Sequence, residues 1–367
     1  MKFEIDRKRL IEAAAIAAKS AGQKTVRPIL ANVLITAKDD TIQFVGTDLE
    51  SMIMLSVPAD VEKEGATTVS AKLFVEMCAG LPSDSLFPVE VESTDSQLII
   101  GCDKVKFQLL TMDSDDFPPV PDLSTLEMAE IKGTILALAM RQAGIAADLD
   151  SGINPVQKAV YVDLIHKPIA ASTDSKRLAV VKINDFDVPE SMKQGWIIPV
   201  KAVKELSEML KNANVAEMAV YKNQLVCRVG GVTYTVRTID GKWPDYTRVL
   251  PKASTSSITV SRKALAQALK SLLPIARNNS NTVAYEFTAD SLSLSANAPE
   301  NGSAETKIDC KVTGEPPNIC LNLQFVTDFL GSVDADDVQM DMTTADYPIL
   351  FSANNGDQRC VCMPMSA

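Results

Sequence analysis

Apolar residues recur at helical spacing in six segments of the chain. In the first segment, one leucine and five alanines follow the i, i+3, i+4, i+7 series, which places side chains on one face of a helix. These residues are Leu10, Ala13, Ala14, Ala17, Ala18 and Ala21. The spacing predicts amphipathic helices over residues 6–21, 70–81, 132–147, 199–212, 261–277 and 322–333.

Two of the longer helices resemble the first in the order of their apolar positions. The third helix is expected to bury Ile135, Leu138, Ala139, Ala143 and Ala146, with Gln142 as the one polar interruption. The fifth is expected to bury Leu265, Ala268, Leu269, Leu272, Leu273 and Ala276. Ser70 and Asn322 are predicted N-caps, and Pro199 is expected in the first turn of its helix.

Short β-type runs separated by turn residues lie between the helices, and their alternation predicts half-buried antiparallel strands. The clearest runs are 33–36, 41–45, 51–57, 89–92, 97–101, 105–111, 159–164, 169–172, 178–183, 217–221, 225–229, 232–238, 283–288, 292–296 and 358–363.

The same order of elements occurs three times. Phe117-Pro118 and Trp243-Pro244 are 126 residues apart, and the same offset carries Gly46-Thr47-Asp48-Leu49 onto Ser172-Thr173-Asp174-Ser175. Two landmarks with one offset indicate a repeated domain. The sequence predicts an α+β fold of three repeats, each with two helices packed on antiparallel sheets, over residues 1–122, 128–252 and 257–367.

Composition narrows the class of protein. The chain has 367 residues, of which 46% are hydrophobic, so well-filled cores need no disulfides. Seven scattered cysteines argue against a disulfide framework, and the single histidine, His166, disfavours metal sites and triads based on histidine. No apolar run is long enough for a membrane span and the N-terminus is charged. We expect a cytoplasmic protein without metal or cofactor.

The net charge of −11 is unevenly distributed. The six predicted helical ranges together carry +8, which leaves −19 for the rest of the chain. If the helices share one surface, that surface is positive on an otherwise acidic protein and suits the backbone of a nucleic acid. Ordinary solvated helix faces would explain the same count. No aromatic residues accompany these cations, so sequence-specific recognition of bases is not expected.

Two other classes of function remain open at this point. The 47 acidic residues could include a general acid/base pair of an enzyme, although no spacing singles one out. An acidic β-rich scaffold that binds only proteins would also fit. A Gly-rich phosphate loop and a metal-ligand cluster are both absent from the sequence.

Several short motifs, in their order across the three repeats, resemble the family of bacterial DNA polymerase III β subunits, the β sliding clamps. The resemblance extends over the whole chain. The motifs are Arg27-Pro28-Ile29-Leu30-Ala31-Asn32, Gly46-Thr47-Asp48-Leu49-Glu50, Thr173-Asp174-Ser175-Lys176-Arg177-Leu178-Ala179-Val180, Trp243-Pro244-Asp245-Tyr246, Arg248-Val249-Leu250-Pro251 and Met363-Pro364-Met365.

The resemblance implies a head-to-tail homodimeric ring with helices around a central hole and sheets on the rim. Such a ring holds double-stranded DNA by enclosure, independently of sequence, and slides along it as a processivity factor. The implied partners are the catalytic subunit of the replicative DNA polymerase, the clamp loader and other replication and repair proteins. The clamp itself catalyses nothing.

The family resemblance also implies three sets of site residues. Partners insert an apolar peptide into a cleft between the second and third domains, where the matching positions are Thr173, Asp174, Arg177, Leu178, Pro244, Arg248, Val249, Val361, Met363, Pro364 and Met365. An equally good interpretation of Leu178, Val249 and Val361 is ordinary core. The DNA-facing positions are Lys24, Lys72, Lys201 and Lys263, and those of the dimer interface are Phe107, Leu109, Ile275 and Ala276.

The chain departs from the family pattern at three places near the cleft. Lys176 stands where a histidine is frequent, Gln157 where a leucine often lines the cleft, and the chain ends in the small residues Ser366-Ala367. These differences bear on which peptides the cleft prefers.

Overall fold

The structure is a computed structural model that describes residues 1–22, 25–148, 154–165 and 167–365. By the contacts within it, the chain forms two compact units. The first consists of Met1–Ile131 and Val215–Arg237, and the second of Lys132–Asn214 and Thr238–Ala367. The second sequence repeat contributes to both units, because its strands divide between two sheets.

As far as the structure describes it, the first unit has one antiparallel sheet of 13 strands in the order β10-β15-β16-β17-β4-β3-β2-β6-β9-β8-β7-β1-β5. The strand β17 of the second repeat hydrogen-bonds to β4 of the first, with Thr235 opposite Met52. The strands are β1 (Lys2–Ile5), β2 (Asn32–Lys38), β3 (Thr41–Thr47), β4 (Ser51–Pro58), β5 (Asp60–Lys63), β6 (Gly65–Ser70), β7 (Val89–Ser93), β8 (Gln97–Cys102), β9 (Val105–Met112), β10 (Ala129–Ile131), β15 (Ala216–Tyr221), β16 (Gln224–Val229) and β17 (Val232–Arg237).

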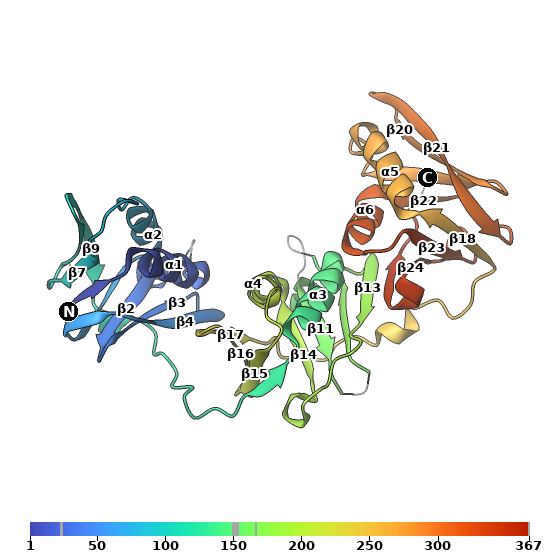
Figure 1. Ribbon diagram of the computed structural model, residues 1–367. Helices are drawn as coiled ribbons and strands as arrows, with labels where there is room; N and C mark the ends of the chain where they lie inside the picture. Colours follow the sequence, from blue (N-terminus) through green and yellow to red (C-terminus); the bar gives the residue numbers. More distant parts are fainter. Residues whose placement is uncertain (23–24, 149–153, 166, 366–367) are drawn as a thin grey trace. The chain divides into compact units, whose positions relative to one another are not determined.

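Two helices, α1 (Arg7–Ala17) and α2 (Ala71–Ala79), pack on one face of this sheet (Figure 1). The predicted stripe is confirmed, because Leu10, Ala13, Ala14 and Ala17 are buried. Alanine lets α1 come so close to β3 that a Cβ added at Gly46 would lie 2.0 Å from the carbonyl oxygen of Ala17.

The described residues of the second unit form one antiparallel sheet of 12 strands in the order β14-β11-β12-β13-β25-β24-β23-β18-β21-β20-β19-β22. The strands are β11 (Ala159–Asp163), β12 (Ile169–Thr173), β13 (Arg177–Lys182), β14 (Gly195–Pro199), β18 (Ser256–Ser261), β19 (Thr282–Phe287), β20 (Ser291–Ala298), β21 (Gly302–Thr313), β22 (Ile319–Asn322), β23 (Asp337–Met342), β24 (Ile349–Ala353) and β25 (Gln358–Cys362). All the strands predicted from alternation are present, whereas several shorter or more polar ones, such as β1 and β21, lacked a sequence signal.

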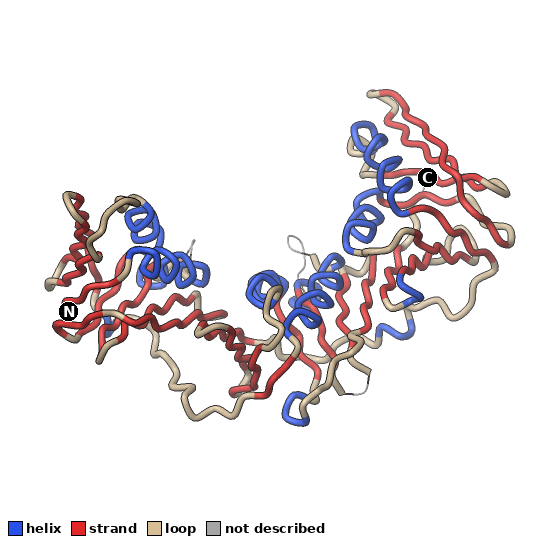
Figure 2. The backbone as a smooth tube through the Cα atoms, viewed as in Figure 1, coloured by secondary structure: helices blue, strands red, loops and turns tan. Residues whose placement is uncertain are grey.

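In the described part of this unit, four helices cover the sheet: α3 (Gly133–Ala143), α4 (Val200–Leu210), α5 (Arg262–Ala276) and α6 (Leu323–Ser332). They pack in two pairs, α3 with α4 and α5 with α6, each on one face of the strands beside it (Figure 2). Asn322 caps α6 as predicted, since its side chain accepts a hydrogen bond from the backbone N–H of Gln324. Pro199 is the N-cap of α4 and therefore precedes the first turn.

The predicted buried face of α3 is confirmed at Ala139, Ala143 and Ala146 but is wrong at Leu138 and only partly right at Ile135. Leu138 is 44% exposed and Ile135 is only half-buried, whereas Leu136 and Met140 are buried. Because α3 contacts strands, α4 and α6, more than half of its circumference is covered, and an almost wholly apolar helix has no unique stripe. Gln142, the predicted interruption, is buried and donates to the carbonyl of Ser332 at the end of α6. In α5, Leu273 is 37% exposed, contrary to expectation.

The internal repeat is reproduced in detail at the turns after β3 and β12. Thr47 donates its hydroxyl to the carbonyl of Ser51 at 2.7 Å, and Thr173 donates to that of Arg177 at the same distance. Leu49 has a φ of 75° and Ser175 a φ of 71°. Equal hydrogen bonds and equal left-handed residues at one offset confirm that the two segments have the same fold.

Candidate binding groove in the second unit

A groove with a cavity volume of about 300 Å³ opens on the second unit. Four segments far apart in the sequence form it, because β13 pairs with β25 while the turn before β11 and the loop before β18 lie beside them. Its lining residues are Asn154, Val156, Gln157, Thr173, Ser175, Lys176, Arg177, Leu178, Trp243, Pro244, Asp245, Tyr246, Val249, Val361 and Met363.

Seven of the eleven predicted cleft residues line this groove: Thr173, Arg177, Leu178, Pro244, Val249, Val361 and Met363. Leu178 lies opposite Val361 in the strand pair, and both are almost fully buried, so they form the floor. Val249 and Met363 are 47% and 41% exposed, which is unusual for large apolar side chains in a folded core. Leu178 and Val361 are therefore core residues that also form the floor of the groove, whereas Val249 is not a core residue and lies at the rim.

The other four predicted residues lie outside the lining. Asp174 is hydrogen-bonded to Arg177. Arg248 is exposed, and its Nε lies 3.0 Å from Oδ2 of Asp245. Met365 is held against β22, because its N–H donates to the carbonyl of Cys320 in that strand. Pro364 lies between Met363 and this bridge.

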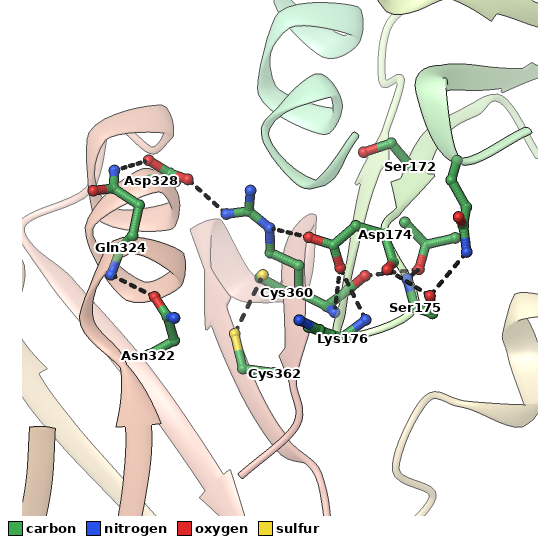
Figure 3. A network of polar contacts seen from close by, with 12 residues as sticks. Ser172, Asp174, Ser175, Lys176, Asn322, Gln324, Asp328, Cys360 and Cys362 are labelled. Carbon is green, nitrogen blue, oxygen red and sulfur yellow. Dashed lines mark hydrogen bonds and ion pairs between the residues drawn. The ribbon is translucent and has the colours of Figure 1, made fainter. Parts of the chain in front are cut away.

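Arg177 lines the groove and joins two segments of the second unit through its bonds to Asp174 and Asp328, both of which are labelled in Figure 3. Its Nε lies 3.0 Å from Oδ2 of Asp174, its Nη1 lies 2.6 Å from Oδ2 of Asp328 in α6, and its guanidinium stacks 4.4 Å from the ring centroid of Phe325. Burial lowers the pKa of Arg177, but the hydrogen bonds and charges of the two carboxylates outweigh burial, so the pKa lies above its ordinary value. The guanidinium therefore stays charged, and the two carboxylates balance its charge.

The predicted set of cleft residues omitted three apolar residues that line the groove, Val156, Trp243 and Tyr246. Trp243 is buried and stacks on Tyr161, with ring centroids 5.2 Å apart and an angle of 9° between the planes. Among the described residues, its indole N–H has no hydrogen-bond partner. The Trp243-Pro244 motif could have indicated this lining residue from the sequence, because a large ring next to a proline with a fixed backbone forms a rigid wall.

The polar rim of the groove is formed by the turn that follows β12. Gln157 donates from Nε2 to the hydroxyl of Ser175 at 2.8 Å. The backbone N–H groups of Lys176 and Arg177 both donate to Oδ1 of Asp174 at 2.9 Å, which fixes the turn. Lys176 itself is exposed at the edge of the groove.

Three of the four predicted DNA-facing lysines lie within the described residues. Lys72, Lys201 and Lys263 are exposed on α2, α4 and α5. Lys24 lies outside the described residues. All three described lysines are thus on helices, where the charge count expects them.

The predicted dimer residues are partly covered within the chain. Phe107 and Ile275 are half-buried, whereas Leu109 and Ala276 are buried at 3% and 0% exposure. Near them, Leu110 on β9 is 78% exposed and Leu273 on α5 is 37% exposed, and neither was among the predicted residues of the dimer interface.

The described part of the chain contains no group of three or more Cys, His, Asp or Glu side chains that could hold a metal ion. None of its helices is long and apolar enough to cross a membrane.

Three sequence models of one family match the chain in order. The DNA polymerase III beta subunit N-terminal domain matches residues 1–121, the central domain residues 130–245 and the C-terminal domain residues 247–366. The chain therefore consists of three clamp domains with mostly antiparallel sheets.

Relatives match over their full length. The beta sliding clamp of Bacillus subtilis (strain 168) is 28% identical over 371 residues, covering 97% of both chains. The beta sliding clamp of Escherichia coli (strain K12) is 28% identical and covers 100% of both. The crystal structure of the DNA polymerase sliding clamp from Bacillus subtilis has a TM-score of 0.92 at 27% identity, covering 100% of this chain and 99% of that chain. The protein therefore belongs to the DNA polymerase III beta subunit family, and its role is that of a non-catalytic processivity clamp.

Proposed function

We propose that two copies of this protein close head to tail into a ring around double-stranded DNA, and that the groove of the second unit anchors the partners that work there. These partners are the catalytic subunit of the replicative polymerase, the clamp loader and other replication and repair proteins. The observation that carries the proposal is the groove itself, in which seven family-matched residues from three separate segments converge.

The groove has the character of a peptide site. Leu178, Val361 and Trp243 offer a buried apolar floor, while the exposed Met363 and Val249 can repack around a ligand. Its volume of about 300 Å³ suits one or two large side chains and not a whole domain. Partners would therefore insert short apolar segments, and most of the binding energy would reside in a few anchor residues.

Free strand edges support the head-to-tail dimer. β9 pairs with β8 along Val105–Leu110, but it pairs with β6 only at Thr111 and Met112. β21 pairs with β20 along Gly302–Asp309 and with β18 only from Cys310 onward. Within the described residues, each strand thus leaves one edge of backbone unpaired, and edges of this kind associate readily.

In the proposed dimer, β9 of one copy pairs with β21 of the other. Phe107, Ile275, Leu110 and Leu273 would supply exposed apolar area beside the strands, while the buried Leu109 and Ala276 would support them from below. Two identical contacts of this heterologous type close a ring.

Encirclement explains how a protein with a net charge of −11 can hold DNA, which is itself negatively charged. A closed ring needs only weak phosphate contacts, from Lys72, Lys201 and Lys263 on its helices and from Lys24, because release requires an interface to open. Retention on circular DNA that disappears when the DNA is linearised would test this directly. Replacing Lys263 with Glu should reduce the salt slope of retention by about one unit or less for each phosphate that the protein no longer neutralises. Tight binding to one linear sequence would contradict the proposal.

Calorimetry tests the groove. An array of overlapping peptides from the polymerase catalytic subunit would identify the segment that binds tightest, and that peptide would be titrated into variants. Leu178→Asp, or deletion of residues 363–367, should weaken binding by about 1–3 kcal/mol or more. In either variant the inserted side chain of the peptide loses part of the apolar surface that buries it. The matched control is Leu86→Asp, a leucine that is 97% exposed in the first unit. Unchanged affinity in both groove variants would place the partner site elsewhere.

The cytoplasmic location and the domain limits at 1–122, 128–252 and 257–367 stay predictions. Expression of 257–367 alone, followed by a test for cooperative unfolding, would check the last of these limits.

A further inference from the structure

Among the ionised side chains that line the groove, Lys176 stands apart. Arg177 is held between Asp174 and Asp328, and Asp245 is bonded to Arg248. The ammonium of Lys176 makes no hydrogen bond or ion pair within the part of the chain that the structure describes. The groove therefore has an apolar floor and one uncompensated positive charge at its rim.

We propose that the groove selects apolar peptides that carry an Asp or Glu next to the inserted side chain, and that Lys176 is the residue that reads this carboxylate. The proposal rests on the peptide-binding function argued above and specifies the chemistry of the partner. It concerns this chain in particular, because it depends on a lysine at position 176.

The backbone around Lys176 is held firmly, so its side chain starts from a fixed point. Its N–H donates to Oδ1 of Asp174 at 2.9 Å, and its carbonyl accepts from the N–H of Met363 at 2.9 Å. Met363 is an exposed wall residue, so the lysine lies directly beside the apolar surface that a peptide would cover (Figure 3 shows Lys176 beside Asp174). A flexible stem of four carbons can then reach the residues that flank an inserted anchor.

Nearby polar groups do not compete for the same carboxylate. Gln157 is occupied by Ser175, and the charge of Arg177 is already balanced from below. Arg248 is 85% exposed and bonded to Asp245. Among the described residues, Lys176 is thus the cation that lines the groove and has no acidic partner, whereas the charge of Arg248 is offset by Asp245.

The net charge of −11 opposes acidic ligands at long range, so the two effects must be compared. Exposed charges farther apart than about 8 Å are largely screened at physiological ionic strength, whereas a contact pair is screened less. A partly exposed ion pair strengthens binding by about two- to fivefold. The local pair therefore decides between peptides that differ at one residue, while the distant charge affects all acidic peptides alike.

The experiment uses three versions of the polymerase peptide that binds tightest in the array, with Asp, Asn or Lys next to its apolar anchor. Each is titrated into the intact protein, into Lys176→Gln and into Lys176→Glu at 50 mM and 300 mM salt. Lys38→Glu, an exposed lysine of the first unit, is the matched control for charge.

We expect the intact protein and the Lys38→Glu variant to prefer the Asp peptide over the Asn peptide by about two- to fivefold at low salt and less at high salt. Lys176→Gln should remove this preference, and Lys176→Glu should favour the Lys peptide. Equal affinity of all three peptides for the intact protein and for Lys176→Glu would overturn the proposal while leaving the groove as the partner site. Failure of every peptide to bind, or binding unaffected by Leu178→Asp, would instead reject the groove function on which it rests.

Discussion

Nη1 of Arg177 lies 2.6 Å from Oδ2 of Asp328, although the two residues are 151 positions apart in the sequence. The pair connects β13, which supplies the groove, with α6 of the third repeat. Because Arg177 also bonds to Asp174 and stacks on Phe325, one side chain links the rim turn, the strand and the helix.

Removing either partner should destabilise the second unit. Asp328→Asn is expected to lower the free energy of unfolding by about 1.5–3 kcal/mol, the range for a hydrogen bond to a charged group. Arg177→Ala should cost more, because it leaves two carboxylates without their cation. Denaturant unfolding followed by fluorescence of Trp196 and Trp243 measures both. Asp245→Asn, which breaks a pair whose side chains are 53% and 85% exposed, is the control and should cost less than about 1 kcal/mol. Equal effects at Asp328 and Asp245 would refute this view of the network.

Gly46 is expected to tolerate no side chain. Its added Cβ would lie 2.0 Å from the carbonyl oxygen of Ala17, so Gly46→Ala must push α1 away from β3. We expect a loss of about 1–3 kcal/mol or more in the stability of the first unit. Gly331→Ala in α6 is the matched control, because its Cβ would meet nothing within 4 Å and alanine favours helix by up to about 1 kcal/mol. Thermal unfolding of both variants should show shifts of opposite sign, and a neutral Gly46→Ala would be inconsistent with this packing.

The cysteines should differ in reactivity. Burial raises the pKa of the Cys78 and Cys227 thiols to about 12, so almost none of either is thiolate at pH 8. Cys310 and Cys320 are partly exposed. Alkylation with iodoacetamide at pH 8, followed by peptide mass spectrometry, should therefore label Cys310 and Cys320 first and leave Cys78 and Cys227 unmodified in the folded protein. Early labelling of Cys78 would show that α2 opens locally on the time scale of the reaction.

Asp357 should make stability depend on pH in the acid range. Its carboxylate accepts from Lys182 at 2.7 Å and from Asn184 at 2.8 Å, and these hydrogen bonds, with that of Lys182 the largest cause, hold its pKa below the ordinary value. A lowered pKa in the folded state means that the contribution is complete above the unfolded pKa of about 3.9 and is lost as the pH falls through the folded pKa. Asp357→Asn should thus lower the Tm at pH 7, and the difference from the original protein should disappear near pH 2. A difference that persists unchanged at pH 2 would assign the effect to packing.

Local pattern identified most elements because their periodicity survives in the fold. The alanine stripe of α1 is buried as expected, and the offset between Thr47 and Thr173 is matched by equal hydrogen bonds. In α3 the same periodicity predicted that Leu138 is buried, but its side chain is exposed. A helix covered on several sides carries apolar residues around most of its circumference, and only its neighbours decide which of them face solvent.

The candidate groove shows the same division. The sequence alone determined the three repeats, the positive character of the helices and the residues Leu178, Val249 and Met363 as candidates. Only the tertiary structure decided that Trp243 lines the groove and that Asp174 does not. It also decided that Arg177 bonds both to Asp174 and to the distant Asp328. Sequence spacing reports which face of one element a residue occupies, whereas contacts between β13, β25, the loop before β18 and α6 depend on how strands pair across repeats, and no local period encodes that pairing.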